Sequence, residues 1–367
     1  MLFHRPASRL ADLLEQQLVT WIFATVCDFL ASRSYLIAVR GLVEQFESFY
    51  DEDLPAFTRV EDLLQHAKLY DLTQKQLKDV LEQANISPLL MDELLTAIVR
   101  INYGQSLTIS GLAGAIGLCG SGADLWAVDG GNRQVPEGLL RKAGAIVHLG
   151  EGVEIVRRVE GGKYDVITRH GDSEQFDVVV IATPLDEGAL QLEPPIALPA
   201  RKLQHTHTTF VVGCVDHKFF NLSRESDLPD TIATMENPTI PFSSIGLLMR
   251  FENGDGAFKV FSRQRPSEEL LDKMFRRRLE TIRIDWAAYP LYKTPEEFAP
   301  FLLDDHHLYY VNAFENAAST VETMAVAAKN VAKLIVKRLS DRTQHRHNVA
   351  STMDLSSDSS YELKSEL

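Results

Sequence analysis

The segment that most constrains this chain is residues 308–338, LYYVNAFENAASTVETMAVAAKNVAKLIVKR, which joins an apolar run, a polar turn and a long helical pattern. Ser319, followed three places on by Glu322, predicts a capping box at the start of the helix. Apolar residues then recur at helical spacing and predict one buried stripe: Val321, Met324, Ala325, Ala328, Val331, Ala332, Ile335, Val336 and Leu339. Small residues at this helix start would leave backbone N–H groups open to a polar or anionic ligand. A buried helix with a good cap would show the same pattern.

Length and charge narrow the classes of protein. The chain has 367 residues, enough for two or three domain-sized units. Its 45% hydrophobic and 24% charged residues are typical of a soluble globular protein. The formal net charge of −14 disfavours nucleic acid as a partner, because phosphate binding requires a basic face.

Cysteines, histidines and apolar runs exclude further classes. The three cysteines are far apart and form no C-x-x-C pair, so neither a disulfide framework nor a zinc site is supported. His205 and His207 could share one strand face, but no third ligand stands at a motif spacing, and we expect no metal site. The longest apolar stretch, Leu18 to Cys27, is too short to span a bilayer. We therefore expect no transmembrane segment, and no signal peptide is visible at the start.

The first hundred residues have the signals of a helical lobe. Capping boxes are predicted at Thr58–Glu61 and Thr73–Gln76, and Ser87-Pro88 places a cap before a proline at the first helical position. A glycine-rich stretch follows, and Gly130-Gly131-Asn132 then leads into a helix that carries Leu139 and Leu140.

Short strands are predicted from residue 145 onward, and the most apolar of them is Phe176–Ala182. We expect this strand to be buried on both faces. Other predicted elements are strands at Ala145–Leu149, Val153–Val159, Lys163–Arg169, Thr208–Val215 and Ala257–Ser262, a basic helix at Ser267–Leu279, and an aromatic segment at Trp286–Tyr292.

Four blocks of sequence, in this order, resemble the prenylcysteine oxidase and farnesylcysteine lyase family of amine-oxidase-like flavoenzymes. They are RINYGQS at 100–106, LWAVDGGN at 125–132, DVVVIATPL at 177–185 and LYYVNAFENAAS at 308–319. The resemblance implies a mixed α/β fold, the C-terminal part of a Rossmann-like FAD-binding enzyme with an inserted substrate domain. The division that it implies is a divergent segment (1–34), a helical substrate-side lobe (35–115), a first FAD-domain portion (116–185), a substrate domain (186–300), an FAD-domain strand and helix (301–340) and a flexible tail (341–367).

The chemistry that the resemblance implies is oxidative cleavage of a thioether. A prenylcysteine, such as farnesylcysteine, loses a hydride from the carbon beside sulfur to FAD, and water adds to the resulting cation. The adduct collapses to cysteine and an isoprenoid aldehyde, and oxygen reoxidises the flavin to give hydrogen peroxide. Because the cofactor carries the hard step, no catalytic side chain is assigned. The family is linked to lysosomal, vacuolar or other endomembrane sites.

One expected unit of the family is missing from this sequence. Dinucleotide-binding domains begin with a strand, a G-x-G-x-x-G turn and a helix, and no such unit occurs in the chain. We therefore expect the ADP-binding half of the FAD site to be absent. Two alternatives stay open, namely a truncated, non-catalytic remnant that cannot hold FAD and another amine-oxidase-like flavoenzyme.

The resemblance also assigns candidate site residues. Those expected around the flavin ring and its ribityl chain are Asn312, Glu315, Ala318, Ser319, Val321 and Glu322, with Gly130, Gly131 and Asn132 approaching the ring and Thr183 and Pro184 at a strand end. Tyr103, Gln105 and Trp126 are the candidates for the substrate pocket. A helix cap, a strand terminator or an aromatic core would account for the same residues without a ligand.

Overall fold

The structure is a computed structural model that describes residues 44–119, 127–186, 188, 190–235, 237 and 239–357, with side chains as far as residue 341. The candidate Trp126, the predicted divergent segment 1–34 and the apolar run Leu18–Cys27 lie outside the described residues. No helix among the described residues is long and apolar enough to cross a membrane.

Short helices form the N-terminal lobe, as the sequence predicts. They are η1 (Ser48–Tyr50), α4 (Val60–His66), α5 (Tyr70–Thr73), α6 (Leu77–Gln83), α7 (Pro88–Leu90), the π-helical η2 (Met91–Leu95), α8 (Thr96–Tyr103) and α9 (Gly111–Cys119). The Ser87 cap is confirmed, because its Oγ accepts a hydrogen bond from the Leu90 N–H at 3.3 Å.

The two other predicted caps of this lobe are wrong, because both threonines make different contacts. The carbonyl of Thr58 accepts a hydrogen bond from the distant Phe301 N–H at 2.9 Å, and α4 begins two residues later. The Thr73 hydroxyl donates to the Tyr70 carbonyl at 2.7 Å, and α6 begins at Leu77. Tertiary and turn contacts therefore override the local capping pattern.

A four-stranded sheet and a two-stranded parallel sheet follow the helix α10 (Gln134–Ala143). The first has the order β3-β2-β1-β5 and contains β1 (Val153–Arg158), β2 (Tyr164–Thr168), β3 (Ser173–Phe176) and β5 (Gln191–Glu193). The second pairs β4 (Val179–Ile181) with β11 (Leu308–Tyr310). The predicted strand at Ala145–Leu149 is wrong, because these residues are irregular and exposed.

The prediction that 176–182 is one strand buried on both faces is also wrong. Only 179–181 form β4, and within it Ile181 is buried whereas Val180 is exposed. The physical reason is that successive side chains of a strand point to opposite faces, and only the face of β4 that carries Ile181 is covered by the core.

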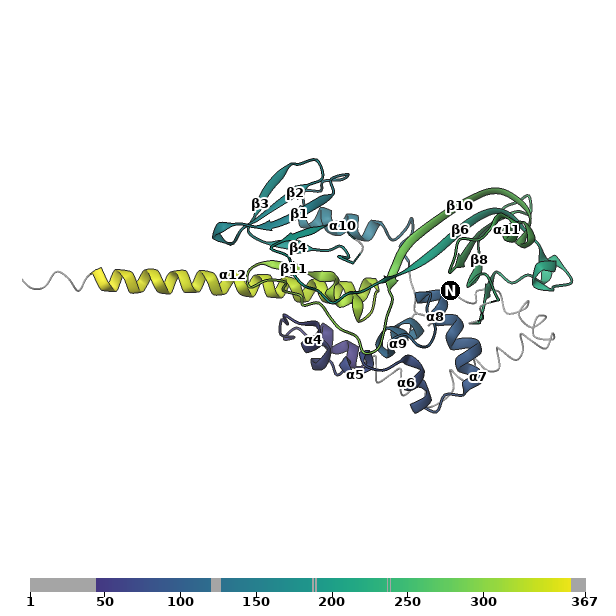
Figure 1. Ribbon diagram of the computed structural model, residues 1–367, viewed down its shortest axis with the longest axis horizontal. Coiled ribbons are helices and arrows are strands. Elements are labelled where there is room, and N and C mark those ends of the chain that lie inside the picture. Colours follow the sequence, from purple (N-terminus) through teal and green to yellow (C-terminus); the bar gives the residue numbers. More distant parts are fainter. Residues whose placement is uncertain are drawn as a thin grey trace, which may run out of the picture.

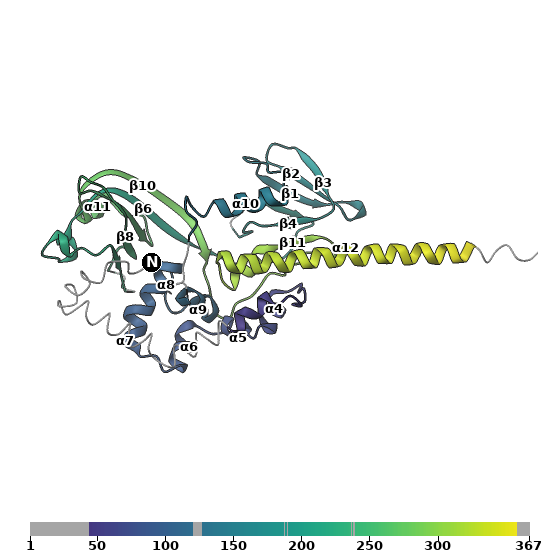
Figure 2. The same ribbon diagram turned by 180° about the vertical axis from the view of Figure 1, so that it is seen from behind.

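A large antiparallel sheet makes up the middle of the chain, in the order β10-β6-β9-β8-β7. Figures 1 and 2 show its long strands arching over the helical lobe. Its strands are β6 (Leu203–Val215), β7 (Thr231–Ala233), β8 (Ser244–Arg250), β9 (Gly256–Ser262) and β10 (Phe275–Pro290), with the turns η4 (His217–Phe220) and η5 (Glu225–Asp227) between β6 and β7. The predicted strands at 208–215 and 257–262 are confirmed.

The predicted basic helix over Ser267–Leu279 is only partly correct. The helix α11 (Glu268–Met274) ends at Met274, and Phe275 begins β10. Pairing with β6, in which Phe275 lies opposite Val215, makes the following residues extended despite their helical pattern. The predicted aromatic segment, Trp286–Tyr292, begins in the last residues of this strand and continues just beyond it.

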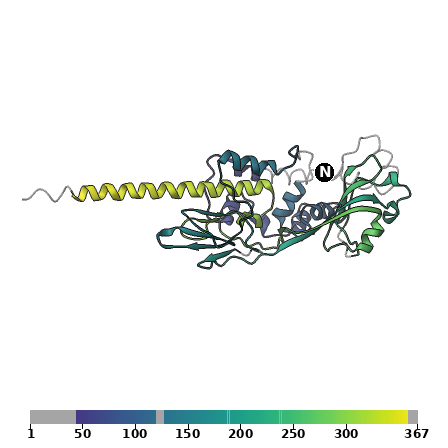
Figure 3. The same cartoon turned by 90° about the horizontal axis from the view of Figure 1, so that it is seen from above.

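The helix α12 (Val321–Ser357) is the longest element and extends well beyond the rest of the molecule (Figures 1 and 3). The 3-10 turn η6 (Val311–Asn316) connects β11 to it, as the sequence predicts. The helix continues as far as Ser357, and residues 358–367 lie outside the described residues. The flexible segment expected from residue 341 stays a prediction.

The predicted buried stripe of α12 is displaced around the helix. Val331 is buried as expected, but Val321 and Val336 are exposed, and the buried apolar residues of this helix are Val326, Ala327, Val331 and Leu334. Asn330 explains the orientation. Its side chain accepts a hydrogen bond from the Phe57 N–H and donates one to the Phe57 carbonyl, both at 2.8 Å. These two bonds fix the side of α12 that faces the core.

Candidate functional site

The start of α12 is capped one residue later than the sequence predicts. The Thr323 N–H donates to the Thr320 hydroxyl, and the Thr320 N–H donates to the Thr323 hydroxyl, both at 3.0 Å. Thr320 and Thr323 therefore form the reciprocal cap expected of Ser319 and Glu322. Glu322 instead accepts a hydrogen bond from the Tyr50 hydroxyl.

The first turn of this helix faces outward. The first N–H groups of any α-helix have no intrahelical acceptor, and Val321 and Glu322 hold these positions with exposed side chains. Ala318, three residues before Val321, is buried, and its carbonyl accepts a hydrogen bond from the Thr323 hydroxyl at 2.8 Å. The N–H groups of Val321 and Glu322 thus lie at an exposed helix start, a position that suits an electronegative ligand edge.

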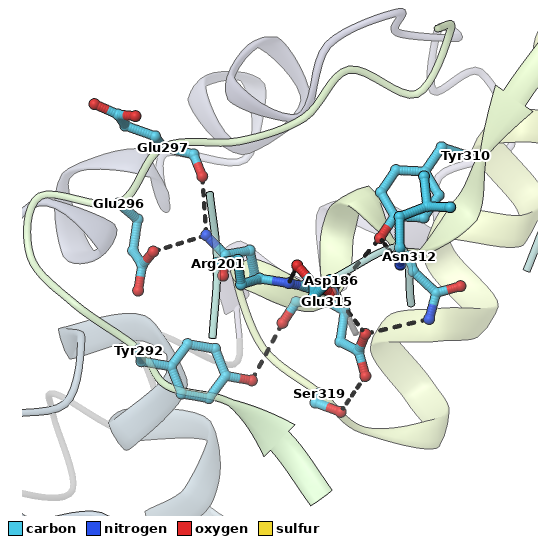
Figure 4. Close-up of polar contacts among 11 residues, drawn as sticks. Asp186, Arg201, Tyr292, Glu296, Glu297, Tyr310, Asn312, Glu315 and Ser319 are labelled. Carbon is cyan, nitrogen blue, oxygen red and sulfur yellow. Dashed lines mark hydrogen bonds and ion pairs between the residues drawn. The ribbon is translucent and has the colours of Figure 1, made fainter. Parts of the chain in front are cut away.

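Glu315 connects two other predicted site residues, Asn312 and Ser319 (Figure 4). One carboxylate oxygen accepts a hydrogen bond from the Ser319 hydroxyl at 3.2 Å. The other accepts from the Asn312 side-chain amide at 3.2 Å. The structure therefore brings Asn312, Glu315 and Ser319 into one hydrogen-bonded group between β11 and α12.

Arg201 balances this carboxylate and was not identified from the sequence. Its guanidinium lies 3.3 Å from Glu315 Oε2 and binds Asp186 through two hydrogen bonds of 2.8 and 2.5 Å. The Arg201 side chain is only 9% exposed. Burial opposes its charge, yet Asp186, Tyr310 and Glu315 outweigh burial and raise the pKa of the guanidinium. No sequence motif joins these residues, so only the fold reveals the cluster.

Buried tyrosines form a wall beside the start of α12. The Tyr103 hydroxyl donates to the Ser319 carbonyl, and the Tyr292 hydroxyl donates to the Glu315 carbonyl, both at 3.2 Å. The two rings meet edge to face with centroids 5.4 Å apart. Burial raises the pKa of both hydroxyls above the usual range of tyrosine, so both remain neutral. The predicted pocket residue Tyr103 therefore contacts the predicted flavin residue Ser319.

Gln105 has a positioning role behind this wall. Its side-chain carbonyl accepts a hydrogen bond from the Tyr292 N–H at 3.0 Å, and its amide donates to the Pro290 carbonyl at 3.0 Å. Because these partners are backbone groups of β10 and the residues just after it, Gln105 fixes the end of that strand against the helical lobe.

A second buried carboxylate lies near the cluster. Glu296 accepts hydrogen bonds from the Lys293 N–H at 2.5 Å and from the Asn316 side-chain amide at 2.7 Å. Burial is the main reason that its pKa is raised to about 7, and the two hydrogen bonds oppose that rise. Glu296 therefore titrates close to neutral pH.

A cavity of about 650 Å³ opens next to these groups. Asp186, Arg201, Tyr310, Asn312 and Asn316 form its polar side. Its apolar side comes from β5 and the residues before and after that strand, with Leu185, Leu190, Leu192, Ile196 and Leu198. The cavity is large enough for a small organic ligand or part of a larger cofactor.

Thr183 and Pro184 follow β4 at the edge of the sheet where Asn312 follows β11. The two strands are parallel, with Tyr310 opposite Ile181, so both polar turns lie at their carboxyl ends. Ligands collect at this edge in open α/β sheets. The Leu185 N–H, which donates to the Tyr310 hydroxyl at 3.4 Å, ties the two turns together.

Gly130, Gly131 and Asn132 lie in an exposed turn before α10. Both glycines have positive φ angles, and the Asn132 side chain accepts a hydrogen bond from the Val128 N–H at 2.9 Å. The hydrogen bonds of this turn are therefore local. The structure does not link them to the group formed by Asn312, Glu315 and Ser319.

The histidine pair is placed as the sequence predicts. His205 and His207 face the same carboxylate oxygen of Asp285, at 3.1 and 3.8 Å. In the part of the chain that the structure describes, no group of three or more His, Cys, Asp or Glu side chains could hold a metal ion. Cys119 and Cys214 are free thiols.

Comparison with known proteins identifies relatives of this chain. Residues 33–348 match the sequence profile of the family described as prenylcysteine lyase. The chain is 50% identical over 302 residues to farnesylcysteine lyase of Arabidopsis thaliana, a match that covers 82% of this chain and 60% of the relative. It is 32% identical over 318 residues to prenylcysteine oxidase 1 of Homo sapiens, covering 78% of this chain and 62% of the relative.

A solved structure supports the fold. A variant of putrescine oxidase that was redesigned in cofactor binding superposes with a TM-score of 0.51 at 14% identity, over 73% of this chain and 69% of the other. This likeness confirms the mixed α/β fold. The chain spans about three-fifths of the length of the two curated relatives named above.

Proposed function

Because this chain belongs to the prenylcysteine lyase family, we propose that it takes part in FAD-dependent oxidation of prenylcysteine thioethers. The proposed reaction releases cysteine, an isoprenoid aldehyde and hydrogen peroxide, with oxygen as the final acceptor. The observation that carries the proposal is the start of α12, where accessible N–H groups adjoin the Asn312–Glu315–Ser319 group and the wall of Tyr103 and Tyr292.

The donors and acceptors at this helix start fit a flavin. A flavin ring presents carbonyl oxygens that require N–H donors, and Val321 and Glu322 place backbone N–H groups at an exposed helix start. Glu315 and Asn312 could hold the hydroxyl groups of the ribityl chain, because both carry side-chain oxygens in the same group. When bound, the flavin would supply the hydride acceptor that the side chains of this chain lack.

The protein's own residues would orient the substrate and exclude water. Tyr103 and Tyr292 are buried and neutral, and they present aromatic surface beside the helix start. Gln105 fixes the chain just after β10, so the tyrosine wall has little freedom to move. The proposed reaction passes through a cation, and water must add to it only at the carbon beside sulfur. A buried wall that keeps other water away suits such a reaction.

A direct test supplies FAD and S-farnesyl-L-cysteine to the purified full chain and measures hydrogen peroxide and the aldehyde under air. We expect both products in equal amounts, and neither from S-methyl-L-cysteine. Peroxide without aldehyde, or no product although FAD is bound, would contradict the proposed function.

The family resemblance also supports a lysosomal, vacuolar or other endomembrane location, which we include in the proposal. Fractionation of cells that express the chain from its natural gene would test it. Recovery with soluble cytosolic markers only would contradict this part.

A further inference from the structure

The five-stranded sheet carries apolar side chains on both of its faces. On one face Val211, Ile245 and Val260 pack against Leu271 and Met274 of α11. An antiparallel sheet whose second face meets water usually has polar residues there. In this sheet the second face carries a group of apolar side chains as well, with Thr208 and Lys259 among them.

We define the open face by Phe210, Phe261, Ile282, Ile284 and Trp286. The strand register places them together, because Ile282 lies opposite Phe210, and Ile284 lies opposite Thr208, which in turn lies opposite Phe261. Ile282, Ile284 and Trp286 alternate along β10 and are 50%, 47% and 44% exposed. A contiguous exposed apolar row of this kind marks a binding surface.

The open face continues directly into the candidate site. The Trp286 and Tyr289 rings have centroids 6.0 Å apart, and the Tyr289 and Tyr103 rings 5.1 Å apart. Tyr103 in turn donates its hydroxyl hydrogen bond to the carbonyl of Ser319. An unbroken series of aromatic contacts therefore joins the start of α12 to the row on β10.

The helical lobe closes one side of the open face. Arg100 of α8 is buried and donates a hydrogen bond to the Thr234 carbonyl at 2.8 Å, beside the end of β7. Arg100, Phe261, Trp286 and Tyr289 line a common hollow of about 20 Å³, which has room for about one water molecule. A long ligand would therefore lie along the exposed row rather than inside the junction.

The length and the apolar character of the row fit an extended isoprenoid chain with its methyl branches. Four residue steps from Trp286 to Ile282 span about 13 Å at the rise of a β-strand, comparable to an extended farnesyl chain. Lys259 lies opposite Phe210, and its ammonium sits 4.6 Å from the centre of the Phe261 ring. Its methylene stem therefore adds apolar surface beside the row, as long cationic side chains do.

We propose that the open face binds the prenyl chain of the substrate, with the thioether end at Trp286, on the side of the row that leads to Tyr103, and the far end at Ile282. Ile282 and Ile284 are then specificity-determining residues that set the preferred chain length. This inference rests on the proposed function, because it takes the prenylcysteine as the ligand. A second copy of this chain, or another part of the same chain, on the open face is the competing occupant that the test must separate.

Calorimetric titration of the full chain with S-farnesyl-L-cysteine tests the proposal without any need for catalysis. Ile284→Asp places a carboxylate in the middle of the row, where desolvation opposes it, and we expect binding at least about 10-fold weaker. Leu279→Asp is the matched control, since Leu279 is an exposed apolar residue of the same strand that lies outside the row. We expect this control to bind within about 2-fold of the natural chain.

Chain length gives a second readout. Ile282→Trp fills the far end of the row, so we expect S-farnesyl-L-cysteine to bind about 10-fold more weakly while S-geranyl-L-cysteine is unchanged. Equal effects of the two aspartate variants, or equal losses for both prenyl lengths, would overturn the proposal. A change of oligomeric state in Ile284→Asp with unaltered ligand binding would also overturn it, in favour of a protein occupant.

The outcome is distinguishable from failure of the proposed function. Binding that depends on Ile284 but leads to no peroxide supports this inference and contradicts the oxidase function. Peroxide production with an unchanged KM in Ile284→Asp contradicts this inference and leaves the oxidase function standing.

Discussion

The two sides of α12 differ sharply although both carry apolar residues. Val326, Ala327, Val331 and Leu334 on one side are buried in the largest core cluster, with Phe314. On the other side Val321 and Val336 are exposed. The helix sequence alone does not separate these sides, whereas the hydrogen bonds of Asn330 to Phe57 do.

The same contrast extends beyond the helix. All three residues of β11 are buried, but Val180 of its partner β4 is exposed. In and after α10, Ile146 is 87% and Leu149 88% exposed, and Leu139 is exposed as well. We use "bare side" for the exposed apolar residues of these elements, which are Val180, Leu139, Ile146, Leu149, Val321 and Val336. The contrast teaches that an apolar pattern shows which residues of an element can be buried. Contacts with the rest of the chain decide which of them are.

The largest expected effect comes from a change in the buried core cluster that packs against α12. Phe314 is buried, and its ring packs against those of Phe49 and Phe301 with centroids 5.9 and 6.2 Å apart. We expect Phe314→Ala to lower the free energy of unfolding by about 3–5 kcal/mol, through lost burial and a cavity. Leu149→Ala on the bare side should change it by less than about 0.5 kcal/mol. Urea unfolding compares the two variants, and similar losses would contradict the contrast.

The next largest effect is a pH dependence of the free energy of unfolding, caused by the buried carboxylate Glu296. Because burial raises the Glu296 pKa from 4.5 to about 7, the folded state holds a proton that the unfolded state releases. This contribution is complete below about pH 4.5 and is lost as pH rises through about 7, by up to about 3 kcal/mol. The free energy of unfolding should therefore fall less between pH 5 and pH 8 in Glu296→Gln than in the natural chain. An identical decrease would show that another group causes it.

The helix start, where the two sides meet, should give an intermediate effect. Thr320 rather than Ser319 makes the reciprocal cap with Thr323. Thr320→Ala should therefore cost about 1 kcal/mol of stability, with a smaller loss for Ser319→Ala. Thermal unfolding ranks the two variants, and the reverse order would restore the cap that the sequence predicts.

The smallest effect on stability is expected on the bare side. Ile146→Lys should leave the free energy of unfolding within about 0.5 kcal/mol of the natural value, because the side chain is already in water. It should, however, reduce self-association, since exposed apolar residues promote contact between molecules. Light scattering over a concentration series measures this, and a large loss of stability would mean that Ile146 is covered in solution.

Much of the architecture could be predicted from local patterns. The helical lobe, the β11 strand, the polar turn and the long helix follow from periodicity and from the Ser87-Pro88 cap. The group of Asn312, Glu315 and Ser319 could also be predicted from the sequence, because its three residues lie close together in one turn and the helix start that follows it.

Other features depend on contacts between distant segments. Arg201 and Asp186 meet Glu315 only after folding, and no spacing in the sequence marks them. The end of α11 at Met274 is set by the pairing of β10 with β6. The side of α12 that is buried depends on Phe57, which lies far away in the sequence.

The most direct test of the central claim, that the start of α12 binds flavin, is an FAD titration of two matched variants. Val321 and Val336 are both exposed on α12, but only Val321 lies in the first turn. We expect Val321→Glu to weaken FAD binding at least about 10-fold by repelling the electronegative ring edge, while Val336→Glu binds as the natural chain does. Equal binding by both variants, or no FAD binding by the natural chain, would contradict the account.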